Sequence, residues 1–135
     1  MKIVSATIAR PVEACWNVFV DPTKLTAWVP GLREARVTQR RADKLAHEIE
    51  FVYAAGLSYA LVYTYDVDAH VVRWEPREGQ KDGLRGFARF TAIDGGTEMT
   101  YAMEHDDGRK AAERALDDPK LLIDAFARRM HEDRD

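Results

Sequence analysis

Two kinds of side chain in the middle of the chain could exchange protons with a substrate: a histidine and a group of tyrosines. His47 opens a stretch in which apolar and acidic residues alternate, and Tyr59 and Tyr63 lie in the next stretch of this kind. An imidazole can give and take protons near neutral pH, and a phenol hydroxyl beside it can polarise a carbonyl. His47, Tyr59 and Tyr63 are therefore the candidate catalytic residues for enolisation, aldol-type ring closure or loss of water. The competing interpretation of His47 is a hydrogen-bonded structural residue, the commoner role of a lone histidine on an apolar face.

Aromatic residues recur at alternate positions of these stretches. Alternate residues of a strand face opposite sides of a sheet, so the apolar set should face inward and the charged set outward. The inward set would form an aromatic interior that suits a flat amphipathic molecule held by stacking and a few hydrogen bonds. The predicted ligand-binding residues are Trp28, Phe51, Tyr53, Trp74, Phe90, Tyr101, Met103, Ile123 and Phe126. The alternative is that these side chains fill an ordinary core.

Turn and cap signals predict the elements that would position these residues. Alternation predicts a first strand over Lys2–Ala9, and Pro11 opens a helix that runs to about Val20. The pair Asp21-Pro22 starts a second short helix, which ends near Trp28. Six more strands follow between about Leu32 and His105, and their short connections favour antiparallel neighbours.

A helix should close the chain, because apolar residues recur at helical spacing from Arg109 to about His131. Pro119 interrupts this pattern, so the segment is either a kinked helix or two helices, the second capped by Asp117-Asp118. The predicted fold class is α+β: a seven-stranded curved antiparallel sheet wrapped around a long C-terminal helix, with two short helices after the first strand.

The composition is that of one folded domain over residues 1–135, with 46% hydrophobic and 32% charged residues. The net charge is −3 and both signs are mixed along the chain, so we expect no nucleic-acid partner. No stretch reaches the ~20 apolar residues of a membrane span and the N-terminus lacks a secretory signal, so we expect a cytoplasmic protein without stable membrane insertion. The lone Cys15 agrees with a reducing compartment. The sequence leaves a homodimer open.

The four histidines are spread over different predicted elements, without the spacing of metal ligands. They are His47, His70, His105 and His131. No helix follows the one Gly-rich hairpin segment, so it should not cradle a phosphate group. We therefore expect no metal and no other cofactor.

With this order of elements the chain resembles the START-like, or birch-pollen-allergen-like, superfamily (SRPBCC), which has the helix-grip fold. The resemblance is carried by the segments ARPVEACWNVFVDPTKLTAWVPGL, VVRWEPREG and GFARFTAIDGGTEMTYAMEH. Within the superfamily the chain is similar to the bacterial polyketide cyclase/dehydrase-related proteins. The resemblance implies a cavity between the sheet and the C-terminal helix that binds a hydrophobic or amphipathic small molecule. The segments mark a fold and contain no catalytic signature.

Three hypotheses about function follow. The first is the binding of a hydrophobic or aromatic small molecule, such as a polyketide-, lipid- or quinone-like compound, in the internal cavity. The second is a polyketide cyclase, aromatase or dehydratase that uses His47 with the tyrosines. The resemblance argues against it in one respect, because aromatase/cyclases of the family tend to place a cation in the cavity and Arg73, Arg85 and Arg89 are expected outside. The third is an interaction protein whose cavity is filled by its own side chains, which a volume below ~300 Å³ would favour.

Overall fold

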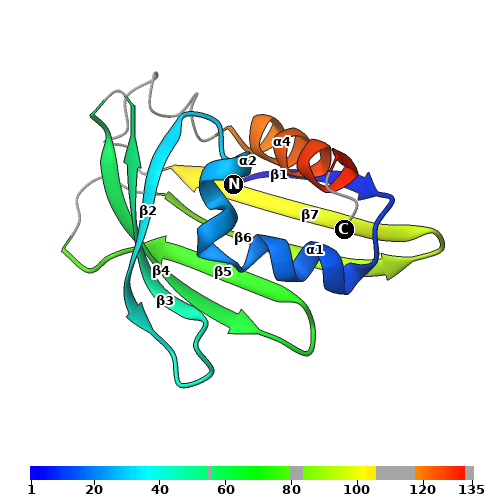
Figure 1. Ribbon diagram of the computed structural model, residues 1–135, viewed down its shortest axis with the longest axis horizontal. Helices are drawn as coiled ribbons and strands as arrows, with labels where there is room; N and C mark the ends of the chain where they lie inside the picture. The colour runs from blue at the N-terminus through cyan, green and yellow to red at the C-terminus, as the bar shows by residue number, and fades with distance from the viewer. Residues whose placement is uncertain (55, 80–83, 106–117, 133–135) are drawn as a thin grey trace.

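A single seven-stranded antiparallel sheet forms the frame of the protein (Figure 1). The computed structural model describes residues 1–54, 56–79, 84–105 and 118–132. The strands are β1 (Lys2–Ile8), β2 (Leu32–Arg40), β3 (Ala46–Tyr53), β4 (Ser58–Asp66), β5 (Val71–Pro76), β6 (Leu84–Ile93) and β7 (Gly96–His105). The helices are α1 (Val12–Phe19), the 3-10 turn η1 (Pro22–Lys24), α2 (Leu25–Trp28) and α4 (Pro119–Glu132). This arrangement confirms the predicted fold class.

The strand order in the sheet is β1-β7-β6-β5-β4-β3-β2. From β2 to β7, each strand pairs with the strand that follows it in the chain, and a short connection joins the two, as is usual for antiparallel neighbours. The first strand instead pairs with the last, Lys2 opposite Met103. The two short helices therefore connect strands at opposite edges of the sheet, and they cross one face of it, the side on which α4 also lies (Figure 1).

Helices α1 and α2 each bury one side against this face of the sheet. Cys15, Trp16 and Phe19 are the buried residues of α1, and Leu25 and Trp28 are those of α2. Between the helices, the Asp21 carboxylate accepts hydrogen bonds from the Thr23 backbone N–H at 3.0 Å and the Thr23 hydroxyl at 2.7 Å. This cap fixes the turn by which the chain changes direction between the two helices.

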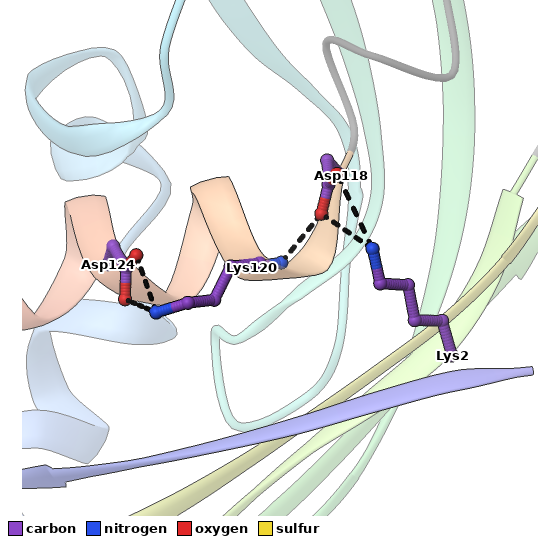
Figure 2. Close-up of polar contacts among 4 residues, drawn as sticks. All are labelled: Lys2, Asp118, Lys120 and Asp124. Atoms are coloured by element: carbon purple, nitrogen blue, oxygen red, sulfur yellow. Dashed lines mark hydrogen bonds and ion pairs between the residues drawn. The ribbon is translucent and has the colours of Figure 1, made fainter.

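Helix α4 begins at Pro119, and polar contacts hold it at both ends. Figure 2 shows Asp118 accepting a hydrogen bond from the Lys120 backbone N–H at 2.9 Å and pairing with Lys2 of β1 at 3.3 Å. Slight burial acts to raise the pKa of Asp118, but the Lys120 N–H and the Lys2 ammonium outweigh it and hold the pKa below its usual value. At the other end, Arg10 donates a hydrogen bond to the Met130 carbonyl at 2.8 Å. These contacts fix α4 along the β1 edge of the sheet.

The sequence left open whether one kinked helix runs through Pro119 or a new helix starts there. In the described part of the chain, Pro119 is the first residue of α4, a position where its missing N–H costs nothing. The predicted start at Arg109 lies outside the described residues, as do Ala112 and Leu116 of the expected apolar face. Leu122, Ile123, Phe126 and Met130 form the buried side of α4. None of the described helices is long and apolar enough to cross a membrane.

Candidate functional site

A narrow internal cavity lies between the concave face of the sheet and the helices. Strands β3 to β7 supply most of its lining, η1 and the helices α1, α2 and α4 supply the remainder, and the chain beside the helices contributes Val20 and Val29. The space open to the centre of a water-sized sphere is about 50 Å³. No charged side chain is present among the described residues that line it. The lining residues Val20, Pro22 and Tyr65 are only half-buried, so the cavity comes nearest to solvent beside them.

Aromatic rings in mutual contact make up one side of the cavity. The Phe19 ring contacts two tryptophans, with its centroid 5.6 Å from that of Trp28 and 6.2 Å from that of Trp74. Trp74 also contacts Tyr101 at 5.3 Å and Tyr63 at 6.1 Å. Contacts of this kind add about 0.5–1.5 kcal/mol per pair beyond the burial of apolar area, and they fix the rings in place.

Tyrosine hydroxyls provide much of the polar chemistry of the lining. Tyr53 and Tyr59 share a buried hydrogen bond of 2.8 Å in which either hydroxyl can donate. Burial raises the pKa of Tyr63 well above its usual value, and the neighbouring Tyr65 and Tyr101 raise it further. Tyr63 is therefore neutral at physiological pH and keeps its proton, so it can donate a hydrogen bond but cannot act as a base there.

Tyr65 is held at the end of β4 that faces α1. Its hydroxyl donates to the Ala46 carbonyl at 2.6 Å, and the Arg41 guanidinium lies 5.1 Å from its ring centroid. Burial raises the pKa of Tyr65 strongly, although Arg41 acts in the opposite direction. The edge of the Tyr65 ring also faces Trp16 at 6.4 Å. These contacts keep a half-buried ring in a fixed position where the cavity approaches the surface.

Two residues of the lining, Trp28 and Trp74, each carry one further polar atom. The indole nitrogens of Trp28 and Trp74 are buried and have no hydrogen-bond partner within the described part of the chain. The two residues are 6% and 4% exposed, so bulk water does not satisfy these donors. Two residues of the lining therefore carry buried N–H groups for which the described residues provide no acceptor.

The structure brings most of the predicted site residues to this cavity. The predicted residues that line it are Trp28, Phe51, Tyr53, Tyr59, Tyr63, Trp74, Tyr101 and Met103. Phe90, Ile123 and Phe126 are buried in the core but are not in the lining. Phe126 instead packs behind it, with its ring 5.0 Å from Trp28 and 5.5 Å from Phe19.

His47 is half-buried and is not among the described residues that line the cavity. The reason is a bulge in β3: Gln39 and Arg40 are consecutive on β2, but they pair with Glu48 and Ala46, which leaves His47 as an extra residue. The alternation that places Ile49 and Phe51 inward therefore breaks at His47, and Ala46 takes the core position with 0% exposure. The catalytic role of His47 stays a prediction that the cavity does not support.

Some residues of the site were not predicted. Phe19, Val20, Pro22, Leu25 and Val29 all come from the helical segment or its ends, and Leu122 comes from α4. The sequence did contain a pattern that could have indicated the contribution of the first helix: the spacing of Cys15, Trp16 and Phe19 marks one apolar side of a short helix. Strand alternation alone could not include them, because it applies only to the sheet.

The other histidines lie apart from the cavity or outside the described side chains. His70 contacts Glu13 of α1 through its Nε2 at 2.9 Å, and the His131 Nε2 accepts a hydrogen bond from the Ala9 N–H at 3.0 Å. The side chain of His105 is outside the described part. Within the described residues, no group of three or more His, Cys, Asp or Glu side chains could hold a metal ion.

Two wider hollows lie on the opposite, outer face of the sheet. One of about 330 Å³ is lined in part by Arg73, Glu75 and Arg85, and another of about 240 Å³ by Arg36, Glu50 and Arg77. Charged residues of both signs line each hollow, and all of those named are exposed except Glu50, which is half-buried. The cavity between the sheet and the helices is lined by aliphatic and aromatic residues, with no charged side chain among the described ones, and we take it as the candidate functional site.

Comparison with known proteins shows the family of the chain. The sequence profile described as "Polyketide cyclase / dehydrase and lipid transport" matches residues 3–133. The chain belongs to this family. A comparison with curated proteins gave no significant match.

Solved structures share the fold of this polyketide cyclase/dehydrase family member. The protein TTHA0849 from Thermus thermophilus has a TM-score of 0.77 and 15% identity, covering 96% of each chain. A START superfamily protein from Mycobacterium smegmatis has a TM-score of 0.76 and 11% identity, covering 97% of each chain. The ZhuI aromatase/cyclase from Streptomyces sp. R1128 has a TM-score of 0.67 and 13% identity, covering 97% of this chain and 86% of its own. Identities this low show a common fold and leave the activity open.

Proposed function

We propose that this protein binds an uncharged hydrophobic or aromatic small molecule, such as a polyketide-, lipid- or quinone-like compound, in the internal cavity. The observation that carries the proposal is the lining, which is aromatic and aliphatic, contains several tyrosine hydroxyls and has no charged side chain among its described residues. An ion brought into such a site would lose its hydration without gaining a partner, whereas a neutral ring would gain apolar contacts. The family supports a ligand of this class.

The size of the cavity limits how such a molecule enters. A volume of about 50 Å³ is smaller than the ~300 Å³ at the lower end of pockets for drug-sized ligands. A one- or two-ring compound must therefore displace lining side chains as it binds. Val20, Pro22 and Tyr65 are the half-buried residues of the lining, so we expect entry beside them.

Native mass spectrometry of the freshly purified protein, compared with its denatured mass, tests the proposal. A bound compound at one copy per chain is the expected result, and its identity would name the ligand. The variant Leu61→Phe enlarges a side chain that lines the cavity and should lose the bound mass. Its matched control is Val62→Phe, because Val62 is the next residue of β4, is absent from the described lining and should leave the bound mass unchanged.

The small volume favours a second candidate, an interaction protein whose cavity is filled by its own side chains. In that case the protein carries no small molecule after purification, and small hydrophobic compounds do not stabilise it. Both results together would replace the first proposal with the second.

A cyclase or dehydratase that acts through His47, Tyr59 and Tyr63 is a further hypothesis. Both tyrosines line the cavity, and His47 is not among the described lining residues. Loss of turnover in His47→Ala with unchanged ligand affinity would support this enzyme. Unchanged turnover would remove His47 from the mechanism.

A further inference from the structure

Two indole N–H groups without a partner among the described residues indicate what kind of atom a ligand must present. Trp28 comes from α2 and Trp74 from β5, so different parts of the chain place them in the same cavity lining. Both nitrogens are buried without an acceptor from the described residues. Buried donors in folded proteins nearly always have a partner, because a donor removed from water without one carries a free-energy cost.

The rings around these donors supply few acceptors. Trp28 packs against Phe19 and Phe126, which have no polar atoms. Trp74 packs against Phe19, Tyr63 and Tyr101, and neither tyrosine hydroxyl accepts a hydrogen bond from its indole nitrogen. Each of the two indoles is therefore a donor without an acceptor among the described residues, whereas a phenylalanine ring would place no such group there.

We infer that Trp28 and Trp74 determine the specificity of the cavity by donating hydrogen bonds to carbonyl oxygens of an uncharged ring compound. A carbonyl oxygen accepts hydrogen bonds and brings neither a charge nor a competing donor into the apolar lining. A hydrocarbon of the same shape would leave both N–H groups without a partner. This inference rests on the proposed function, and it adds the chemical class that the site selects.

The gap between hydrocarbon and ketone affinities tests the inference. The probes are indane and 1-indanone, which have nearly the same shape and differ in one carbonyl group. Calorimetric titration should show that the protein binds 1-indanone about tenfold more tightly than indane, beyond the difference in water solubility of the two compounds. The ratio of the two affinities is the readout, because loss of ring volume in a variant affects both probes alike.

Tryptophan variants identify the donors. Trp28→Phe or Trp74→Phe should bring the affinity ratio close to one, because each removes an N–H group and keeps an aromatic ring. Trp16→Phe is the matched control: Trp16 is 5% exposed, but it is absent from the described lining and its nitrogen is not among the buried groups that lack a partner. Its ratio should equal that of the parent protein.

Indole ¹⁵N–¹H spectra of the unmodified protein give a readout that does not depend on the stability of variants. Addition of 1-indanone should move the N–H signal of Trp28 or Trp74 downfield, and indane should not. Equal affinities for the two probes, with no such shift, would overturn the inference and leave the proposed function intact, with bound water as the partner of the indoles. Failure of both probes to bind would overturn the inference, and together with a purified protein that carries no bound compound it would overturn the proposed function as well.

Discussion

Truncation of Leu122 tests whether the cavity exists in solution where the structure has it. Leu122 is 3% exposed and lines the cavity from α4, whereas its neighbour Leu121 is 45% exposed on the same helix. Replacing a buried leucine by alanine costs about 2–5 kcal/mol. One side of Leu122 already faces empty space, so fewer contacts are lost and we expect about 2–3 kcal/mol. The same change at Leu121 should cost less than about 0.5 kcal/mol.

Urea denaturation measures both losses. The midpoint should fall in Leu122→Ala with little change in the slope, and it should hardly move in Leu121→Ala. Because the truncation widens the cavity, indane should stabilise Leu122→Ala more than the parent protein. At a hundred times its dissociation constant, indane would restore about 2.7 kcal/mol. Equal losses in the two variants, or no rescue by indane, would refute the assignment of Leu122 to the cavity wall.

Other predictions concern the frame around the site. Gly86→Ala should destabilise the protein by about 1–3 kcal/mol in urea denaturation, because a Cβ there would lie 2.0 Å from the Ala102 carbonyl oxygen; an unchanged midpoint would contradict that close approach. Asp118→Ala should lower the free energy of unfolding by about 1 kcal/mol, because α4 loses its cap. Asp124→Ala breaks only an exposed ion pair with Lys120 and should lower it by at most about 0.5 kcal/mol. A larger loss in Asp124→Ala than in Asp118→Ala would contradict the role of Asp118 as the cap. Stability should fall as pH rises above about 10, because the unfolded chain then loses a proton that folded Tyr63 retains. Tyr63→Phe should show a shallower fall in a pH series of urea midpoints, and an identical slope would mean that this hydroxyl ionises freely in the folded state.

The sheet could be predicted from the sequence because its signals are local. Alternation gives the strands, and short turns such as Asp94-Gly95-Gly96 allow only antiparallel neighbours. The positive φ of Gly95, 82°, shows why glycine is needed in that turn. Alternation also places Phe51, Tyr63 and Trp74 correctly on the concave face, because no irregularity interrupts their strands there.

The site was harder to predict where it depends on more than one strand. His47 leaves the inward set through a bulge in the pairing of β3 with β2, and alternation within one strand cannot reveal such an irregularity. Phe19 and Leu122 reach the cavity only because β1 pairs with β7 and brings the helices over the concave face. The narrow volume of the cavity depends on how side chains pack in three dimensions, and so does the lack of a partner for the Trp28 and Trp74 nitrogens among the described residues. Composition and periodicity do not determine this packing.

The most direct test of the central claim is the set of nuclear Overhauser effects between bound 1-indanone and the side-chain methyl groups of the protein. The account predicts contacts with Ile49, Leu61 and Met103, which line the cavity and are at most 3% exposed. It predicts none with Ile93 or Leu121, which are more than 40% exposed. Contacts confined to the exposed methyl groups, or no contacts at saturating ligand, would contradict the claim that this cavity is the binding site.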